Sequence, residues 1–210
     1  MFRNRFATLF AIAALTAVTA TYAREGNTLQ DEFRIYSAET LQQCESVKSQ
    51  LKSFIMDSDP LTGYTLKDSV QSLCVCIPAK LEALKAKTPA ADMAKEVTEK
   101  QVHELFDPAV VAKCAGEQMR GMYAEDCPKR FKLEGLDAPK YCACMKDVMS
   151  KYSEADTVAL ASAAADYLPK AAEAEKNELP LPQKAPILEG YFDADQKCKG
   201  DQKSFEQLKF

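Results

Sequence analysis

Apolar positions along the chain recur at intervals of three and four residues, which is the period of one face of an α-helix. Two stripes in the first half follow this spacing, one between Ser37 and Met56 and one around the first Cys-x-Cys tripeptide. Their members are Leu41, Cys44, Val47, Leu51, Phe54 and Ile55, and then Val70, Leu73, Cys74, Ile77, Leu81 and Leu84. Strand-type alternation is nearly absent from the sequence, so the pattern predicts an all-α fold.

Capping signals set the expected helix starts in the first half. The candidate starts are Ser37, Thr65, Thr88-Pro89 and Asp107-Pro108. A Ser, Thr or Asp side chain can accept a backbone N–H bond at the start of a helix. A proline directly after the cap gives up an N–H that has no partner in the first turn. The last two starts predict helices over 89–105 and 108–122.

The second half carries its own start and stop signals. The predicted helices are a short one from Pro128, one over 137–152, an alanine-rich one from Ser153 to about Lys176 and one over 187–199. The prolines of Leu179-Pro180-Leu181-Pro182, and Pro186 after them, cannot continue a helix. We therefore expect an extended link between the last two helices.

The first 23 residues have the three parts of a secretory signal peptide. Arg3 and Arg5 are followed by a 13-residue uncharged segment from Phe6 to Val18, and Thr21-Tyr22-Ala23 provides a cleavage site. Cleavage would leave 187 residues with 25 basic and 31 acidic side chains, a net charge of −6. No later stretch reaches the roughly 20 apolar residues of a membrane span. The sequence thus predicts a periplasmic or secreted protein without a membrane span after cleavage.

The composition and charge of the chain disfavour or exclude several classes of function. The 210-residue chain is 47% hydrophobic and 28% charged, which is ordinary for a globular protein. A net charge of −4 and a pI near 5.2 argue against nucleic-acid binding through phosphate neutralisation. The single histidine excludes sites that need two imidazoles.

The cysteines are the most informative residues. The chain contains Cys44, Cys74, Cys76, Cys114, Cys127, Cys142, Cys144 and Cys198. An even number of cysteines in an exported protein favours a structural disulfide framework over a metal site.

These cysteines fall into two sets that each read C…CxC…C, with intervals of 30, 2 and 38 residues and then of 15, 2 and 54. We interpret the two sets as a divergent internal duplication. The predicted organisation is a signal peptide (1–23), a first helical half (24–122) and a second helical half (123–210).

Helix geometry assigns a role to each CxC pair. Residues i and i+2 of a helix point in directions about 200° apart, so the two cysteines face nearly opposite sides. They are poorly placed to bond each other but can reach two different neighbours. In the first half this leaves two pairings open, Cys44–Cys74 with Cys76–Cys114 or Cys44–Cys76 with Cys74–Cys114, and the second half has the same ambiguity.

Other candidate chemistry is sparse. A redox role would use the CxC pairs, which lack the C-x-x-C spacing at a helix start. A Cu(I) site could add thioethers, but methionine at helical spacing is usually core packing; the methionines concerned are Met119, Met122, Met145 and Met149. His103 has no nucleophile motif beside it, and the acidic pairs Asp57/Asp59 and Glu125/Asp126 are typical of solvated loops. No catalytic, cofactor-binding or metal residue is therefore assigned, and a non-enzymatic protein is expected.

A binding function remains as the hypothesis. We expect an exported helical protein that binds a protein partner, for instance as an inhibitor or immunity protein for an envelope hydrolase or toxin, with acidic loops 56–60 and 124–126 as contact points. A net charge of −6 would speed encounter with a basic partner.

A carrier of a small ligand or lipid is one alternative, and a thiol-redox or metal-binding protein is another. Plant lipid-transfer proteins are also helical with eight cysteines, but their pattern has one Cys-Cys and a single CxC. This chain has two CxC pairs and no Cys-Cys, so it is not assigned to that family.

Overall fold

The computed structural model describes residues 26–55, 60–124, 126–131 and 136–200. These residues form helices and no strand, which confirms the all-α prediction. The first half contains α2 (Leu29–Ser53), α3 (Pro60–Gln71), η1 (Ser72–Cys76), α4 (Ile77–Lys87), α5 (Ala90–Met93), α6 (Glu99–Phe106), η2 (Asp107–Val111) and α7 (Ala112–Met122). The second contains α8 (Cys127–Arg130), α9 (Ala138–Ser150), α10 (Glu154–Lys176) and α11 (Pro186–Lys199). The predicted signal peptide lies outside the described residues.

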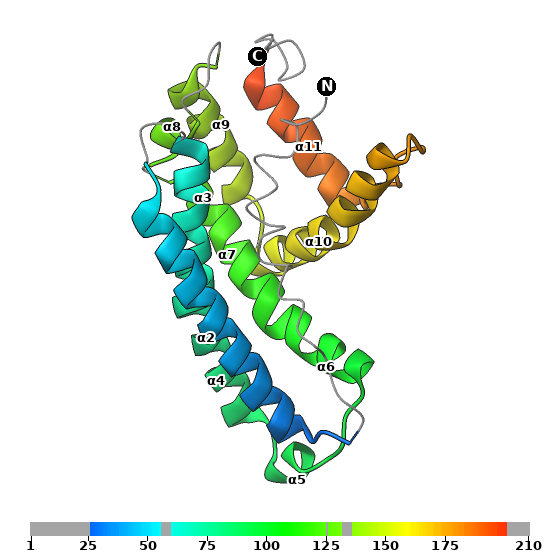
Figure 1. Cartoon of the computed structure of the whole chain (residues 1–210). Coiled ribbons are helices and arrows are strands. Elements are labelled where there is room, and N and C mark those ends of the chain that lie inside the picture. The colour runs from blue at the N-terminus through cyan, green and yellow to red at the C-terminus, as the bar shows by residue number, and fades with distance from the viewer. Residues whose placement is uncertain (1–25, 56–59, 125, 132–135, 201–210) are drawn as a thin grey trace.

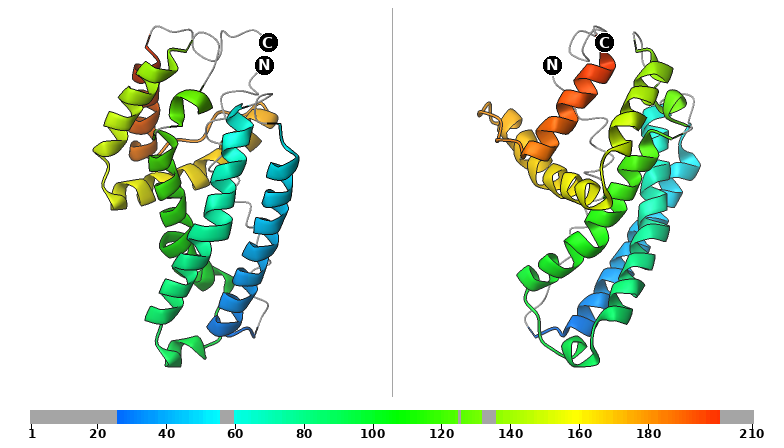
Figure 2. Two further views of the ribbon diagram at one scale, coloured as in Figure 1. Left: turned by 90° about the vertical axis from the view of Figure 1, so that its left-hand side faces the viewer. Right: turned by 180° about the vertical axis from the view of Figure 1, so that it is seen from behind.

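The first half is an up-down-up bundle of three long helical rods (Figure 1). The rods are α2, the continuous run from α3 through η1 to α4, and the continuous run from α6 through η2 to α7. In the second half, α10 crosses the bundle steeply and α11 returns toward the end of the molecule at which α9 begins (Figures 1 and 2). A single cluster of buried residues draws from both halves, including Phe33, Phe106, Tyr141, Leu160 and Leu188.

The contact between α7 and α10 is the most extensive helix packing among the described residues. Small side chains allow the two helices to approach closely. A Cβ atom added to Gly116 of α7 would lie 3.2 Å from backbone and side-chain atoms of Thr157 in α10. The packing of α10 against the bundle therefore depends on the absence of a side chain at this glycine.

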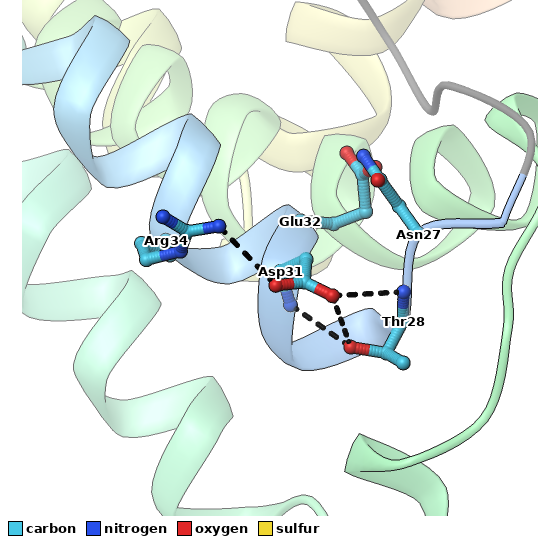
Figure 3. A network of polar contacts seen from close by, with 5 residues as sticks. All are labelled: Asn27, Thr28, Asp31, Glu32 and Arg34. Atoms are coloured by element: carbon cyan, nitrogen blue, oxygen red, sulfur yellow. Dashed lines mark hydrogen bonds and ion pairs between the residues drawn. The ribbon is translucent and has the colours of Figure 1, made fainter.

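The first long helix is capped by Thr28, nine residues before its predicted cap at Ser37. Thr28 and Asp31 form a reciprocal capping box: the Thr28 hydroxyl accepts the Asp31 backbone N–H, and the Asp31 carboxylate accepts the Thr28 backbone N–H (Figure 3). Hydrogen bonds from the Thr28 side chain and backbone lower the pKa of Asp31. Ser37 instead donates to the Phe33 carbonyl within the helix. The signal that was missed is the apolar run Leu29, Phe33 and Tyr36, all three of which are buried.

Another predicted start is wrong, and a predicted helix that does begin near its expected start is interrupted. Thr65 lies inside α3, where its carbonyl accepts the Ser69 hydroxyl. The predicted helix over 89–105 is interrupted after α5 and begins again at Glu99, capped by Thr98. Between these helices, the chain at 95–97 forms backbone hydrogen bonds with residues 27 and 29, so a tertiary contact replaces the helix.

The predicted start at Asp107-Pro108 is a wide turn within a continuous helix. The Ala112 backbone N–H donates to the Asp107 carbonyl, an i→i+5 bond that defines a π turn. Pro108 has no N–H, so the normal helical ladder is already broken at this point. The helix therefore passes through Pro108 instead of beginning there.

The second half follows its predicted starts closely. Asp137 accepts the Lys140 N–H at the start of α9, and Ser153 forms a capping box with Asp156 at the start of α10. Hydrogen bonds from Ser153 lower the pKa of Asp156. Pro128 lies in the first turn of α8, and Pro186 begins α11.

Candidate functional site

All eight cysteines are paired in four disulfides, which confirms the prediction of disulfide bonds. The pairs are Cys44–Cys74, Cys76–Cys114, Cys127–Cys142 and Cys144–Cys198. In both sets the first cysteine bonds the first member of the CxC pair, and the last cysteine bonds the second member. The structure thus selects the same one of the two open pairings in each half.

The two members of each CxC pair reach different helices, as helix geometry predicts. In η1, Cys74 is bonded to α2 and Cys76 to α7. In α9, Cys142 is bonded to α8 and Cys144 to α11. The first pair lies in a π turn rather than in a regular α-helix, because the Ile77 N–H donates to the Ser72 carbonyl.

The residues of the metal and catalytic alternatives lie in two different settings, the core and the surface. The four methionines considered for copper are all buried in the core. His103 is partly exposed on α6, with its Nδ1 2.9 Å from a carboxylate oxygen of Asp107 one turn further along. Within the described ranges, no group of three or more His, Cys, Asp or Glu side chains is arranged to hold a metal ion.

The predicted acidic contact points are largely outside the described residues. Asp57, Asp59 and Glu125 fall in the undescribed positions. Asp126 is exposed, and its carboxylate lies 3.5 Å from the Lys129 ammonium. Of these four acidic residues, Asp126 is the one that the structure describes.

A different surface stands out by its exposed apolar side chains. The large hydrophobic residues that are exposed in the described ranges are Leu41, Ile55, Val75, Leu179 and Leu181. Leu179 and Leu181 are 59% and 50% exposed, and both lie in the link between α10 and α11. We call residues 177–185 the Leu-Pro loop. It projects from the body of the molecule, away from the three-rod bundle (Figures 1 and 2).

The start of the Leu-Pro loop is fixed by a helix-ending motif. The Leu179 N–H donates to the Ala174 carbonyl and the Glu178 N–H to the Glu175 carbonyl, the two bonds of a Schellman motif. Glu178 has a φ of 54°, a left-handed conformation that glycine usually supplies. A glutamate here costs about 1 kcal/mol relative to glycine, so surrounding structure holds the chain in this turn.

The end of the loop is held by a cation over two rings. The Lys184 ammonium lies 5.6 Å from the ring centre of Tyr167 in α10 and 5.5 Å from that of Phe192 in α11. Contacts of this length are within the range of cation–π attraction. Pro186 then begins α11, and Leu188 is fully buried. Both ends of the loop are thus attached to the core, whereas its two leucines face solvent.

A buried polar network holds α11 against α7 and α9. The Tyr123 and Tyr191 hydroxyl oxygens are 2.6 Å apart, and the Tyr141 hydroxyl donates to the Asp195 carboxylate over 2.6 Å. The Lys199 ammonium contacts the other oxygen of the same carboxylate. Together with the Cys144–Cys198 disulfide, these bonds fix the helix that follows the Leu-Pro loop.

Burial dominates the electrostatics of this network. It raises the pKa of Tyr123, Tyr141 and Tyr191 well above the ordinary tyrosine value, and neighbouring tyrosines or the Asp195 carboxylate raise it further. The hydroxyls therefore stay protonated even at alkaline pH, where Tyr141 donates to Asp195 and one of Tyr123 and Tyr191 donates to the other.

The sequence predicted this segment as an extended link but did not identify it as a surface. The available signal was the alternation of two leucines with two prolines in an otherwise polar link. Whether those leucines are buried depends on how α10 and α11 cross, which no local pattern encodes.

Comparisons of the chain with protein-family models, with curated proteins and with solved structures found no match. None of the helices in the described part of the chain has the length and apolar character required to cross a membrane.

Proposed function

We propose that this protein is an exported, non-catalytic binding protein that presents the Leu-Pro loop to a protein partner. The observation that carries the proposal is the exposure of Leu179 and Leu181 in a loop whose two ends are fixed to a disulfide-bonded core. A loop held in one conformation before binding loses little entropy when a partner engages it.

The prolines suit the loop to recognition. Pro180 and Pro182 restrict the backbone to extended conformations, so the segment is close to the form in which grooves bind proline-containing chains. Two leucines then supply apolar area of the kind that anchors an interface. The partner we infer has a groove lined by apolar or aromatic side chains.

Charge near the loop adds a second property of the partner. Glu173, Glu175 and Glu178 precede the leucines and outnumber Lys176 in the same segment, whereas Lys184 is directed over the Tyr167 and Phe192 rings. A basic rim around the groove would therefore be complementary, and the net acidity of the chain would steer the encounter. An inhibitor or immunity protein for a basic envelope hydrolase or toxin has this combination of properties.

The disulfides support this proposal over a thiol-redox or thiolate-metal role. Every cysteine sulfur is bonded to another, so the structure presents no thiolate at either CxC pair. Four bridges that each close 15 to 54 residues suit a scaffold for an oxidising compartment.

A capture experiment tests the proposal. The wild-type protein, a Leu179→Ser/Leu181→Ser double variant and a Leu41→Ser control would be immobilised and exposed to extract from the cell envelope. Leu41 is 63% exposed on α2, so its replacement removes exposed apolar area from a different face. We expect a basic protein to be captured by the wild type and the control but lost with the double variant. Equal capture by all three proteins would contradict the loop as the binding surface.

A further inference from the structure

A pocket of about 390 Å³ lies between the first turn of α9 and the last turn of α11, away from the Leu-Pro loop at the other end of α11. Lys140 and Tyr141 line it from α9, and Lys197 and Lys199 line it from α11. Asp137, which caps α9, lines the same pocket. Three lysines thus border one hollow in a chain whose overall charge is −4.

One wall of the pocket is fixed by buried contacts. Asp195 is only 8% exposed and accepts the Tyr141 hydroxyl on one carboxylate oxygen while the Lys199 ammonium contacts the other. The side chain of Lys199 is 16% exposed, so this cation is largely held inside the protein. Cys198 also lines the pocket, and its disulfide to Cys144 keeps α11 next to α9.

The remaining charge on the pocket is positive. Lys199 balances Asp195, which leaves Lys140 and Lys197 against the single carboxylate of Asp137. Both of these lysines are exposed, so their ammonium groups can move toward a ligand at the pocket mouth. Lysine is a flexible point charge that commonly binds phosphate. The positive end of the α9 dipole and the negative end of the α11 dipole meet at this pocket, so its net positive charge comes from the lysines.

We propose that this pocket binds a phosphate group, carried by a small soluble molecule or by a lipid headgroup. Lys140 and Lys197 supply the charge that attracts the phosphate. Lys199, fixed by Asp195, and Tyr141 shape the wall of the pocket. The site is independent of the Leu-Pro loop, so it would give the protein a ligand in addition to its proposed protein partner.

The test uses the full exported protein with glycerol phosphate as the soluble probe and phosphatidylglycerol vesicles as the lipid probe. Binding of glycerol phosphate is followed through the backbone amide signals of Lys140, Lys197 and Gly200 in NMR spectra. A Lys140→Gln/Lys197→Gln double variant is compared with Lys146→Gln/Lys170→Gln, which removes the same charge from exposed positions outside the pocket lining.

We expect at least one probe to bind the wild type and the matched control, and the pocket variant to lose at least tenfold in affinity. Loss of glycerol phosphate binding in the pocket variant would assign a soluble ligand. Loss of vesicle binding alone would assign a lipid headgroup. Failure of both probes to bind the wild type, or equal losses in the two double variants, would overturn the proposal.

Discussion

The two cysteine sets have the same pairing order but hold different kinds of structure. In the first set, the bridges of η1 join it to α2 and α7, which belong to long rods that already pack along their lengths. In the second set, the bridges of α9 join it to the four-residue helix α8 and to α11, which follows the exposed Leu-Pro loop. The same cysteine pattern therefore adds bridges to a bundle of long rods in the first half. In the second half it joins α9 to α8, a short helix, and to α11, which follows an exposed loop.

This difference indicates where disulfides matter most for function. The bundle region has the Phe33–Phe106 and Tyr36–Phe106 ring contacts at 4.8 and 5.2 Å to stabilise it besides its bridges. The position of α11, and with it the Leu-Pro loop and the pocket between α9 and α11, depends on one bridge, a small polar network and the burial of Leu188 and Tyr191. The predicted duplication of the two halves stays a prediction, since the shared pairing order does not by itself establish it.

The largest effect is expected from removing the bridge to α11. A Cys144→Ala/Cys198→Ala variant should lose about 4 kcal/mol of unfolding free energy, because that bridge closes 54 residues. Hydrogen exchange should accelerate in α11 while the amides of α2 stay protected. The matched Cys44→Ala/Cys74→Ala variant should lose a similar free energy but keep α11 protected. If hydrogen exchange of the α11 amides accelerated equally in both variants, the two sets of bridges would not differ in the structure that they hold.

Removal of the ion pair between Arg130 and Asp68, which joins the two halves, should give the next largest loss of unfolding free energy. Arg130 of α8 is 6% exposed and binds the Asp68 carboxylate of α3 through two guanidinium nitrogens. Arg130→Ala should cost about 3 kcal/mol in urea unfolding, because it leaves a partly buried carboxylate without its partner. The exposed Arg34–Asp31 pair provides a control, and Arg34→Ala should cost less than about 1 kcal/mol. Equal costs would show that α8 is not attached through this pair.

Glycine substitutions in α7 test the contact between the regions. Gly116→Ala should cost about 1 to 2 kcal/mol, because its new Cβ would meet Thr157 at 3.2 Å and push α10 away. Gly121→Ala should stabilise by about 0.5 to 1 kcal/mol, since nothing lies within 4 Å of the added atom and alanine favours helix. Thermal unfolding of the two variants would check the opposite signs. Stabilisation by both would mean that α7 and α10 are not in tight contact.

A smaller effect is expected at the start of the Leu-Pro loop. Glu178→Gly should stabilise the protein by about 1 kcal/mol, because glycine adopts the observed φ of 54° without steric cost. Partner capture should persist with some loss of affinity, since the leucines are unchanged but one of the three acidic side chains before them is removed. Destabilisation in urea unfolding would indicate that the Glu178 side chain, rather than its backbone, fixes the loop.

The tyrosine network gives a prediction about pH. Burial raises the pKa of Tyr123, Tyr141 and Tyr191, so the folded state keeps protons that the unfolded state releases near pH 10. This contribution to stability is complete below that pH and is lost as the pH rises above it. Tyrosinate absorbance should show these three groups ionising only as circular dichroism reports unfolding. Ionisation of every tyrosine in an intact fold would contradict the buried network.

Local signals predicted much of the second half. Asp137 and Ser153 act through hydrogen bonds within one turn, and Pro186 acts through its fixed φ and missing N–H, so local sequence was enough to place α9, α10 and α11. The first half was predicted less well because segments distant in sequence decide its breaks. The contact of 95–97 with residues 27 and 29 is one case, and the passage of the helix through Pro108 is another.

The candidate site was harder to predict than the fold. Helix geometry predicted that each CxC pair would reach two neighbours, but the choice of partner depends on the order in which helices pack. The exposure of Leu179 and the convergence of Lys140 with Lys197 likewise depend on the placement of α11. Tertiary geometry of this kind has no signature in hydrophobic spacing.

The central claim is that the eight cysteines form a scaffold rather than a reactive site. Peptide mapping by mass spectrometry under non-reducing conditions, on protein purified from an oxidising compartment, tests it most directly. We expect no free thiol and four linked peptides, joining Cys44 to Cys74, Cys76 to Cys114, Cys127 to Cys142 and Cys144 to Cys198. Free thiols at either CxC pair, or a bond between its two members, would contradict it.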